Sequence, residues 1–408
     1  MNVMTAESAE AQLASKNTFF RQSGWMMIAG VAAGACMFAV HPFAKAIEGS
    51  EYGVFVTLLS VFNLLTIPGI AMQMVFAQQT SAALTIEQRR QLAGTTRAVL
   101  LGTFLIWLAV ALVVLANQQN ILTRFKITNP FGLYVTLLLG LGSIWTPIFN
   151  GILQGHQNFF WLGWSSILGG LGRLTAVAII VLVFHGQSTG MITGALVGMA
   201  GPLVLLVWHS RDIWLKELSA SIAWKPWLAR VMPLTLGFGA YQFLFSADAL
   251  FVQNYFHKDE TGPYMAAGIL ARAIVLFTGP LSAVMFPKIV RSVARAEKTD
   301  LMKVALITTA GLACCAALGL SVVAPWIFPL VFQKSFSVIA PLLPWFAWSM
   351  VPLTVANVLV NNLMARERFG VVPWLILLAV GYGVALANWH DSFLTVIRTL
   401  AVFNFLAM

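Results

Sequence analysis

The chain has 408 residues, of which 59% are hydrophobic and 9% charged, and its mean hydropathy is +0.84. Soluble proteins carry about 25% charged residues, so this composition excludes a soluble enzyme or a soluble binding module. The formal net charge is +10, and most of the 24 Lys and Arg residues fall in loops on one side of the predicted membrane spans. This bias follows the positive-inside rule, so it indicates topology and not nucleic-acid binding, and it places the N-terminus in the cytoplasm.

Apolar runs return roughly every 30 residues, and about 20 such residues suffice for a transmembrane helix. The sequence therefore predicts an all-α polytopic membrane protein with about 12 helices. The His41-Pro42 pair is expected to kink the outer end of the first helix, because proline has no backbone N–H. In chain order the predicted helices are Gly24–Ala44, Tyr52–Ala77, Ala98–Ala116, Leu133–Leu153, Leu162–Phe184, Met191–Trp208, Met232–Phe256, Tyr264–Ile289, Val304–Pro325, Ile339–Met364, Val371–Trp389 and a short last segment within 392–408.

The connections between these helices are short, so no soluble catalytic domain fits on either side. The longest inner connection mixes charged residues with tryptophans, a composition typical of the lipid interface. We place the boundary between two lobes in it. The predicted organisation is a cytoplasmic tail at 1–23, an N-terminal lobe of six helices at 24–209, a cytoplasmic linker at 210–230 and a C-terminal lobe of six helices at 231–408.

The two lobes resemble each other in sequence. A shift of 212 positions places Tyr52 under Tyr264 and Pro68 under Pro280. Six helices per lobe is an even number, so the second copy would enter the membrane in the same orientation, giving a parallel repeat with a V-shaped central cleft. Pro68 and Pro280 are candidate hinges for motion of the lobes, or static kinks. A shift of 210 positions likewise aligns Leu153, Phe159 and Trp164 with Leu363, Phe369 and Trp374.

Three charged residues lie well inside the predicted spans, namely Arg173, Asp248 and Arg272. Arg272 lies 8 residues below Tyr264 on a descending helix, and Asp248 lies 8 residues before the outer end of the preceding ascending helix. Both are therefore about 12 Å deep, at 1.5 Å per residue. This predicts an ion pair, which makes both charges tolerable. Asp248 could also hold Arg272 until a diphosphate or a proton displaces it.

Arg173 has no acidic neighbour in the sequence and lies about 16 Å deep, near the membrane midplane. A guanidinium group binds phosphate through paired hydrogen bonds, so Arg173 is a candidate ligand for a pyrophosphate head group. The alternative is that it bonds backbone carbonyls in a packed lobe. Gly169, Gly170 and Gly172 beside it would let a neighbouring helix or a cargo approach closely.

Polar residues form a stripe along the predicted seventh helix. Gln242, Ser246 and Gln253 fall within about 20° of the direction of Thr235 at 100° per residue. The stripe could bind sugar hydroxyls in a wet cleft or make hydrogen bonds between packed helices. The same two interpretations apply to Asn357 and Asn361, one turn apart in a later helix.

Other chemistry is not indicated by the sequence. Arg21, near the cytoplasmic start of the first helix, is a topology anchor or the first contact for an anionic head group. The histidines and the three cysteines lack the spacing of metal ligands or of a disulfide framework, so we expect no metal and no cofactor. No nucleophile motif, phosphate loop or pair of catalytic carboxylates is recognisable, which argues against an enzyme.

Several segments resemble a known family. They are EYGVF at 51–55, GPY at 262–264 leading to MFPKIV at 285–290, and the long segment from SFSVIAPLLPW to MARERFG at 335–370. These are similar to the Wzx-type flippases of the multidrug/oligosaccharidyl-lipid/polysaccharide exporter superfamily. The resemblance implies two six-helix lobes around a cationic cleft that opens alternately to each side, with Arg272 where lipid-flipping relatives carry an arginine. The predicted first helix lacks the acidic residue of many drug exporters in that superfamily, which disfavours a drug exporter.

The resemblance also implies a cargo and a location. The expected cargo is a polyprenyl-pyrophosphate-linked oligosaccharide for O-antigen, capsule or exopolysaccharide synthesis, moved across the bacterial cytoplasmic membrane. Membrane lipid and a polysaccharide polymerase or co-polymerase are the expected partners of a monomer. The alternative is an ion-coupled multidrug exporter of the same superfamily, for which Asp248 is the candidate coupling carboxylate. The glycan, the lipid carrier and the energy source stay open at this point.

Overall fold

The structure is a computed structural model that describes residues 24–26, 28–215, 224–275, 301–366 and 368–408. Every regular element in these ranges is helical. Ten of the described helices are long and apolar enough to cross a membrane, six in the first half of the chain and four in the second. Two further helices, over residues 258–275 and Phe393–Ala407, bring the second half to six as well. The predicted all-α polytopic architecture is therefore confirmed.

The first half of the chain runs from a helix over residues 28–38 to α8, and the second from α9 to α14. The first half contains η1 (His41–Ala46), α2 (Gly49–Leu65), α3 (Ile67–Ala82), α4 (Ile86–Ala116), α5 (Gln118–Arg124), α6 (Pro130–Gly155), α7 (Phe159–Leu182) and α8 (Gln187–Trp214). The second contains α9 (Trp224–Tyr255), the helix over 258–275, α11 (Leu301–Val331), η2 (Lys334–Leu342), α12 (Leu343–Ala365), η3 (Phe369–Val371), α13 (Val372–Asn388) and α14 (Phe393–Ala407).

Most helices are longer than predicted, and caps explain part of the difference. The helix predicted from Ala98 begins at Ile86, because Thr85 and Gln88 form a capping box that satisfies two free backbone N–H groups. Both α8 and α9 extend into the predicted linker at 210–230, and the predicted outer loop after Ala116 contains α5. The N-terminal tail and the part of the predicted eighth helix beyond residue 275 lie outside the described residues.

Two prolines interrupt spans in the first half. The helix over 28–38 gives way to the 3-10 helix η1, which has Pro42 in its first turn, as the predicted kink requires. Pro68 lies in the first turn of α3, where its missing N–H is not needed, and α2 and α3 together form one span over Gly49–Ala82. The hinge role of Pro68 stays a prediction.

Small residues set the helix packing in the first half. A Cβ atom at Gly151 of α6 would lie 2.5 Å from the Gln73 carbonyl oxygen of α3, and one at Gly198 of α8 would lie 2.6 Å from the Arg173 Cβ of α7. In a membrane, where lipid is as apolar as leucine, close backbone approach of this kind replaces the hydrophobic effect as the packing force. By contrast, only 17% of the most apolar window of α4, and likewise of α11, is buried, so these helices face lipid.

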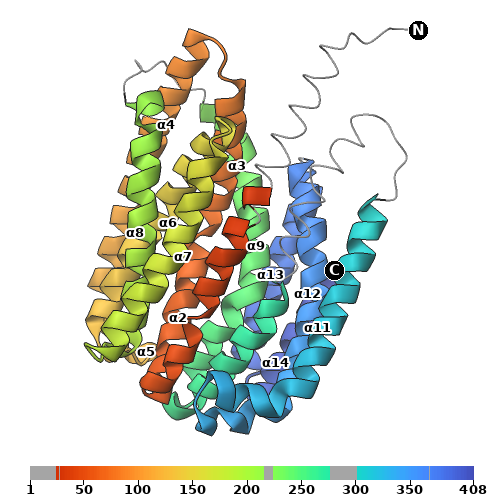
Figure 1. Ribbon diagram of the computed structural model, residues 1–408. Helices are drawn as coiled ribbons and strands as arrows, with labels where there is room; N and C mark the ends of the chain where they lie inside the picture. Colours follow the sequence, from red (N-terminus) through yellow and green to blue (C-terminus); the bar gives the residue numbers. More distant parts are fainter. Residues whose placement is uncertain (1–23, 27, 216–223, 276–300, 367) are drawn as a thin grey trace.

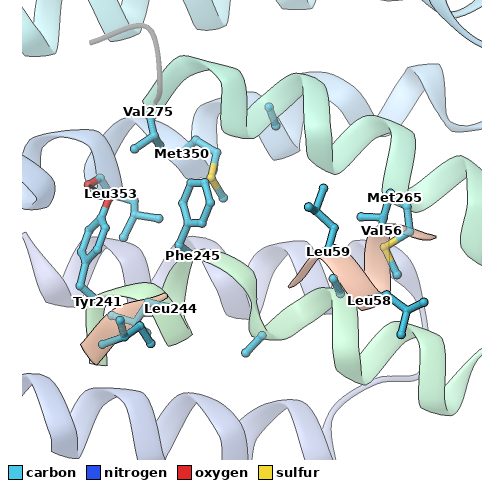
Figure 2. Packing of buried hydrophobic residues seen from close by; sticks show 14 of the residues in the cluster. Val56, Leu58, Leu59, Tyr241, Leu244, Phe245, Met265, Val275, Met350 and Leu353 are labelled. Carbon is cyan, nitrogen blue, oxygen red and sulfur yellow. Dashed lines mark hydrogen bonds between the residues drawn. The ribbon is translucent and has the colours of Figure 1, made fainter. Parts of the chain in front are cut away.

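The two halves lie side by side and meet along α2, α3 and α9 (Figure 1). A continuous buried apolar cluster crosses this boundary; Figure 2 shows Val56 and Leu59 of α2 with Phe245 of α9 and Met350 of α12 among its members. The outer end, named after the predicted orientation, is formed by residues 41–53, 117–130, 183–190, 253–262 and 330–342, and the inner end is the opposite one.

Candidate functional site

Asp248 of α9 and Arg272 of the next helix form a buried ion pair. The Arg272 Nη2 atom lies 2.6 and 2.7 Å from the two carboxylate oxygens of Asp248. The Arg272 side chain is 6% exposed and the Asp248 side chain 0%. The pairing confirms the prediction from their equal depth on sequence-adjacent antiparallel helices.

The surroundings of this pair complete its hydrogen bonding. The Tyr264 hydroxyl donates to Asp248 Oδ2 at 2.8 Å, and Arg272 Nε donates to the Phe245 carbonyl at 2.8 Å. The rings of Phe245 and Phe346 lie 5.9 and 5.5 Å from the guanidinium carbon. Such a pair is electrically neutral and well hydrogen-bonded, which makes it tolerable in an apolar interior. In this conformation the Arg272 guanidinium group is bonded to Asp248. A cargo could therefore bind Arg272 only after displacing the Asp248 carboxylate.

Arg173 of α7 is also buried, at 7% exposure, but its charge is not compensated. No described residue forms a hydrogen bond or an ion pair with its guanidinium group, and the Nε atom is buried without a partner. Neighbouring helices pack against the glycines beside it: Gly169 contacts α8, and Gly170 contacts the helix over 28–38. They therefore serve helix packing here. The expected alternative, bonding to backbone carbonyls, is not observed among the described residues.

Two polar side chains within electrostatic range of Arg173 belong to η1 and α2. Arg173 interacts electrostatically with His41 and Tyr52, whose side chains are joined by a 2.9 Å hydrogen bond between His41 Nδ1 and the Tyr52 hydroxyl. The Tyr52 ring in turn contacts Phe332 and Phe336 of the second half, with ring centroids 5.5 and 5.9 Å apart. The uncompensated cation is thus linked to the boundary between the halves at the outer end.

The predicted polar stripe of α9 is mostly engaged within the protein. The Ser246 hydroxyl is buried and donates to the Gln242 carbonyl of its own helix at 2.9 Å, and Gln253 Nε2 donates to the Phe125 carbonyl at 3.1 Å. Gln242 is half-buried. Of the stripe, Gln242 therefore remains the better candidate for a cargo contact.

Asn357 and Asn361 of α12 are half-buried and bonded to each other. Asn361 Nδ2 donates to the side-chain oxygen and to the carbonyl of Asn357, both at 2.8 Å. Their exposure leaves them candidates for contacts with hydroxyl groups, and that role stays a prediction. Arg21 and Pro280 lie outside the described residues.

A second buried carboxylate, missed in the sequence analysis, lies at the outer end. Glu51, which lies just before the predicted helix Tyr52–Ala77, is the third residue of α2 and only 5% exposed. Its Oε1 atom accepts a hydrogen bond from Thr128 at 2.8 Å and lies 3.5 Å from the Lys258 ammonium group, and its Oε2 atom accepts one from Ser188. Lys258 belongs to the other half, and residues 51 and 258 are too distant in sequence for spacing to reveal the contact.

The outer ends of the two halves are in direct contact around this group. Lys126 Nζ donates to the carbonyls of Gln253 and Phe256, and burial lowers the pKa of its ammonium group below the usual range. Gln333 Nε2 donates to the Ala44 and Ile47 carbonyls at 2.9 and 2.5 Å. These contacts join the outer ends of the two halves, which we call the closed state of this end.

Solved structures with the same fold include two kinds of transporter. No protein-family model and no curated protein matches the chain. An inward-facing multidrug resistance MATE transporter of the MOP superfamily aligns at a TM-score of 0.71, with 11% identity over 94% of this chain and 95% of that one. The lipid II flippase MurJ in an inward closed conformation aligns at 0.73, with 16% identity over 95% of this chain and 86% of that one.

A further MATE structure shares the fold. An outward-facing MATE transporter of the MOP superfamily aligns at a TM-score of 0.56, with 13% identity over 95% of this chain and 92% of that one. Neither kind of neighbour is a Wzx-type protein, so that finer resemblance rests on the sequence segments alone. The chain has the fold shared by MATE transporters and MurJ.

Proposed function

We propose that this protein is an alternating-access transporter that flips a polyprenyl-pyrophosphate-linked oligosaccharide across the bacterial cytoplasmic membrane, for O-antigen, capsule or exopolysaccharide synthesis. The fold supports a transporter, because its solved neighbours are MATE transporters and a lipid flippase. The proposed orientation keeps the N-terminus in the cytoplasm, in agreement with the distribution of Lys and Arg.

The observation that carries the cargo class is the uncompensated charge of Arg173. An arginine at the centre of a transmembrane helix is unfavourable by roughly 2.5–3.5 kcal/mol on insertion scales. Arg272 offsets this penalty with Asp248, whereas no described carboxylate or carbonyl compensates Arg173. A diphosphate supplies the missing negative charge and matches the planar fork of the guanidinium group.

The remaining cargo contacts are assigned by chemistry. The half-buried amides of Gln242, Asn357 and Asn361 suit sugar hydroxyls, since an amide both donates and accepts hydrogen bonds. Arg21 is proposed as the first contact of the head group at the cytoplasmic side. Membrane lipid surrounds the monomer, and a polysaccharide polymerase or co-polymerase is the proposed protein partner.

The test is a flipping assay on purified protein in liposomes, with a fluorescent polyprenyl-diphosphate oligosaccharide whose outer-leaflet pool is bleached by an impermeant reductant. Arg173→Ala should lower the initial rate at least about tenfold, since a charged hydrogen bond contributes about 1.5–3 kcal/mol. Arg173→Lys should retain part of the rate, because it keeps the charge but loses the fork. Arg398→Ala is the matched control, because Arg398 also lies in an apolar helix but is exposed and stacked on Trp345.

The outcome against the proposal is normal flipping by well-folded Arg173→Ala protein. The alternative, an ion-coupled multidrug exporter, is favoured by the likeness to multidrug MATE structures. It predicts efflux of a cationic dye from the same liposomes, and dye efflux without flipping would replace the proposed function. The uncompensated positive charge of Arg173 disfavours a cationic cargo at that site.

A further inference from the structure

Glu51 differs from Asp248 in where its compensating charge comes from. Asp248 is paired with Arg272 inside one half. Glu51 receives two hydroxyl groups from its own half, those of Thr128 and Ser188, and its ammonium partner Lys258 from the other half. The charge balance of Glu51 therefore depends on the position of the two halves, and that of Asp248 does not.

Close backbone contact at the outer end brings Lys258 to Glu51. A Cβ atom added at Gly53 would collide with the Thr261 side chain, and one added at Gly262 would collide with the Gly49 carbonyl oxygen. Glycine permits this approach because it has no side chain. If the outer ends separate, Lys258 moves away from the carboxylate, while the two hydroxyl groups stay with it.

The two hydroxyl partners suit both protonation states of Glu51. A serine or threonine hydroxyl can donate to a carboxylate and can equally accept a hydrogen bond from a carboxylic acid. With Lys258 adjacent, the ionised form is stabilised by the opposite charge. When Lys258 moves away, the carboxylate loses that stabilisation and binds a proton more readily than before. A ligand shifts a conformational equilibrium only through its different affinity for the two states, and here that ligand is a proton.

We propose that Glu51 is a proton-binding site whose occupancy couples protons to opening of the outer end. Glu51 is ionised and paired with Lys258 when the outer end is closed, and binds a proton when the halves separate there. The proposal rests on the proposed function only in requiring that the halves move relative to each other, and it is independent of the cargo. It replaces Asp248 as the coupling carboxylate.

Other titratable groups surround this end of the molecule. Of these, Lys258 alone is in contact with the Glu51 carboxylate among the described residues. Lys126 and Lys45 are bonded to backbone carbonyls, and the remaining groups lie on neighbouring turns. The titratable residues on the elements around Glu51 include His41, Lys45, Glu48, Tyr52, Arg124, Lys126, Arg173, His185, His257, Lys258, Asp259, Glu260 and Lys334.

The test measures the separation of the outer ends as a function of pH. Spin labels are attached to Gln119→Cys on α5 and Val338→Cys on η2, both exposed at the outer end of opposite halves, in a variant whose three native cysteines are replaced by alanine. Distance distributions are recorded by pulsed electron paramagnetic resonance in lipid nanodiscs from alkaline to acidic pH. Acidification should transfer population from a short to a long separation.

Three variants decide the role of Glu51. Glu51→Gln, which keeps an acceptor for both hydroxyl groups, should populate the long separation at every pH and lose the pH dependence. Lys258→Met should move the transition to higher pH, because the carboxylate loses its stabilising cation. Glu48→Gln, which removes an exposed carboxylate three residues earlier, should behave as the parent protein.

Three results would overturn the proposal. The first is a Glu51→Gln variant whose label distances keep the pH dependence of the parent protein. The second is a parent protein whose label distances do not change with pH. The third is a parent protein whose label distances change when sodium is replaced by choline and not when the pH changes. The spin labels report the separation of the two halves and do not report binding or transport of the cargo. Failure of the flipping assay with an intact pH response would therefore reject the cargo assignment and leave this site standing.

Discussion

Replacing Asp248 by asparagine should destabilise the protein strongly. The carboxylate is fully buried and accepts two short hydrogen bonds from Arg272 and one from Tyr264. The substituted amide could still accept the hydrogen bond of Tyr264, but the guanidinium group would be left buried without a counter-charge. Removing one partner of a buried ion pair lowers stability by about 3–5 kcal/mol. We therefore expect a loss of that size in the free energy of unfolding of Asp248→Asn.

The measurement is unfolding by sodium dodecyl sulfate titration in mixed micelles, followed by circular dichroism. The double variant Asp248→Asn/Arg272→Met should recover most of the loss, since neutral groups of similar size replace both charges. Arg398→Met is the control for an exposed arginine and should change stability little. If Asp248→Asn unfolds like the parent protein, the pair does not stabilise the fold. If Arg272→Met abolishes flipping with unchanged stability, Arg272 is a cargo ligand after all.

Three further changes test the packing and the hinge. Gly198→Leu should reduce the yield of folded protein, because even a Cβ atom at this position would lie 2.6 Å from the Arg173 Cβ of α7. Gly311→Ala should be neutral, because a Cβ atom there would meet nothing within 4 Å. The yield of detergent-extracted protein measures both effects. Gly53→Ala should weaken closure of the outer end, shown by a longer separation of the spin labels, and Gly102→Ala, also in open space, should not. Pro68→Ala should slow flipping if the break before α3 is a hinge and leave it unchanged if the proline is a static kink; unfolding by detergent titration checks that the fold survives.

Local sequence patterns predicted most of the helices and the buried ion pair between Asp248 and Arg272. Asp248 and Arg272 lie on adjacent antiparallel helices, so counting residues from their shared outer end gives their depths. The Glu51–Lys258 contact could not be found in this way, because residues 207 positions apart meet only when the two halves pack. Its one sequence signal was the acid before Tyr52 at the start of a repeated segment.

The polar stripe of α9 shows a second limit of sequence reasoning. Angular periodicity placed Gln242, Ser246 and Gln253 on one face, but periodicity does not say which groups are available. Ser246 bonds the carbonyl one turn before it, which satisfies its hydroxyl inside its own helix. Gln253 instead bonds the Phe125 carbonyl in a connection predicted as an irregular loop. Availability depends on these bonds, of which the first is local to the helix and the second follows from tertiary packing.

The buried charges of this protein differ in how they are compensated, and this difference matters if the two halves move relative to each other. Asp248 and Arg272 compensate each other within one half, so separation of the halves leaves their balance unchanged. Glu51 is compensated across the boundary, and Arg173 is not compensated by any described residue. Only groups whose interactions differ between two states can bias the equilibrium between them. The Glu51–Lys258 contact is lost when the halves separate, so a proton bound at Glu51 can bias that equilibrium in the way we propose.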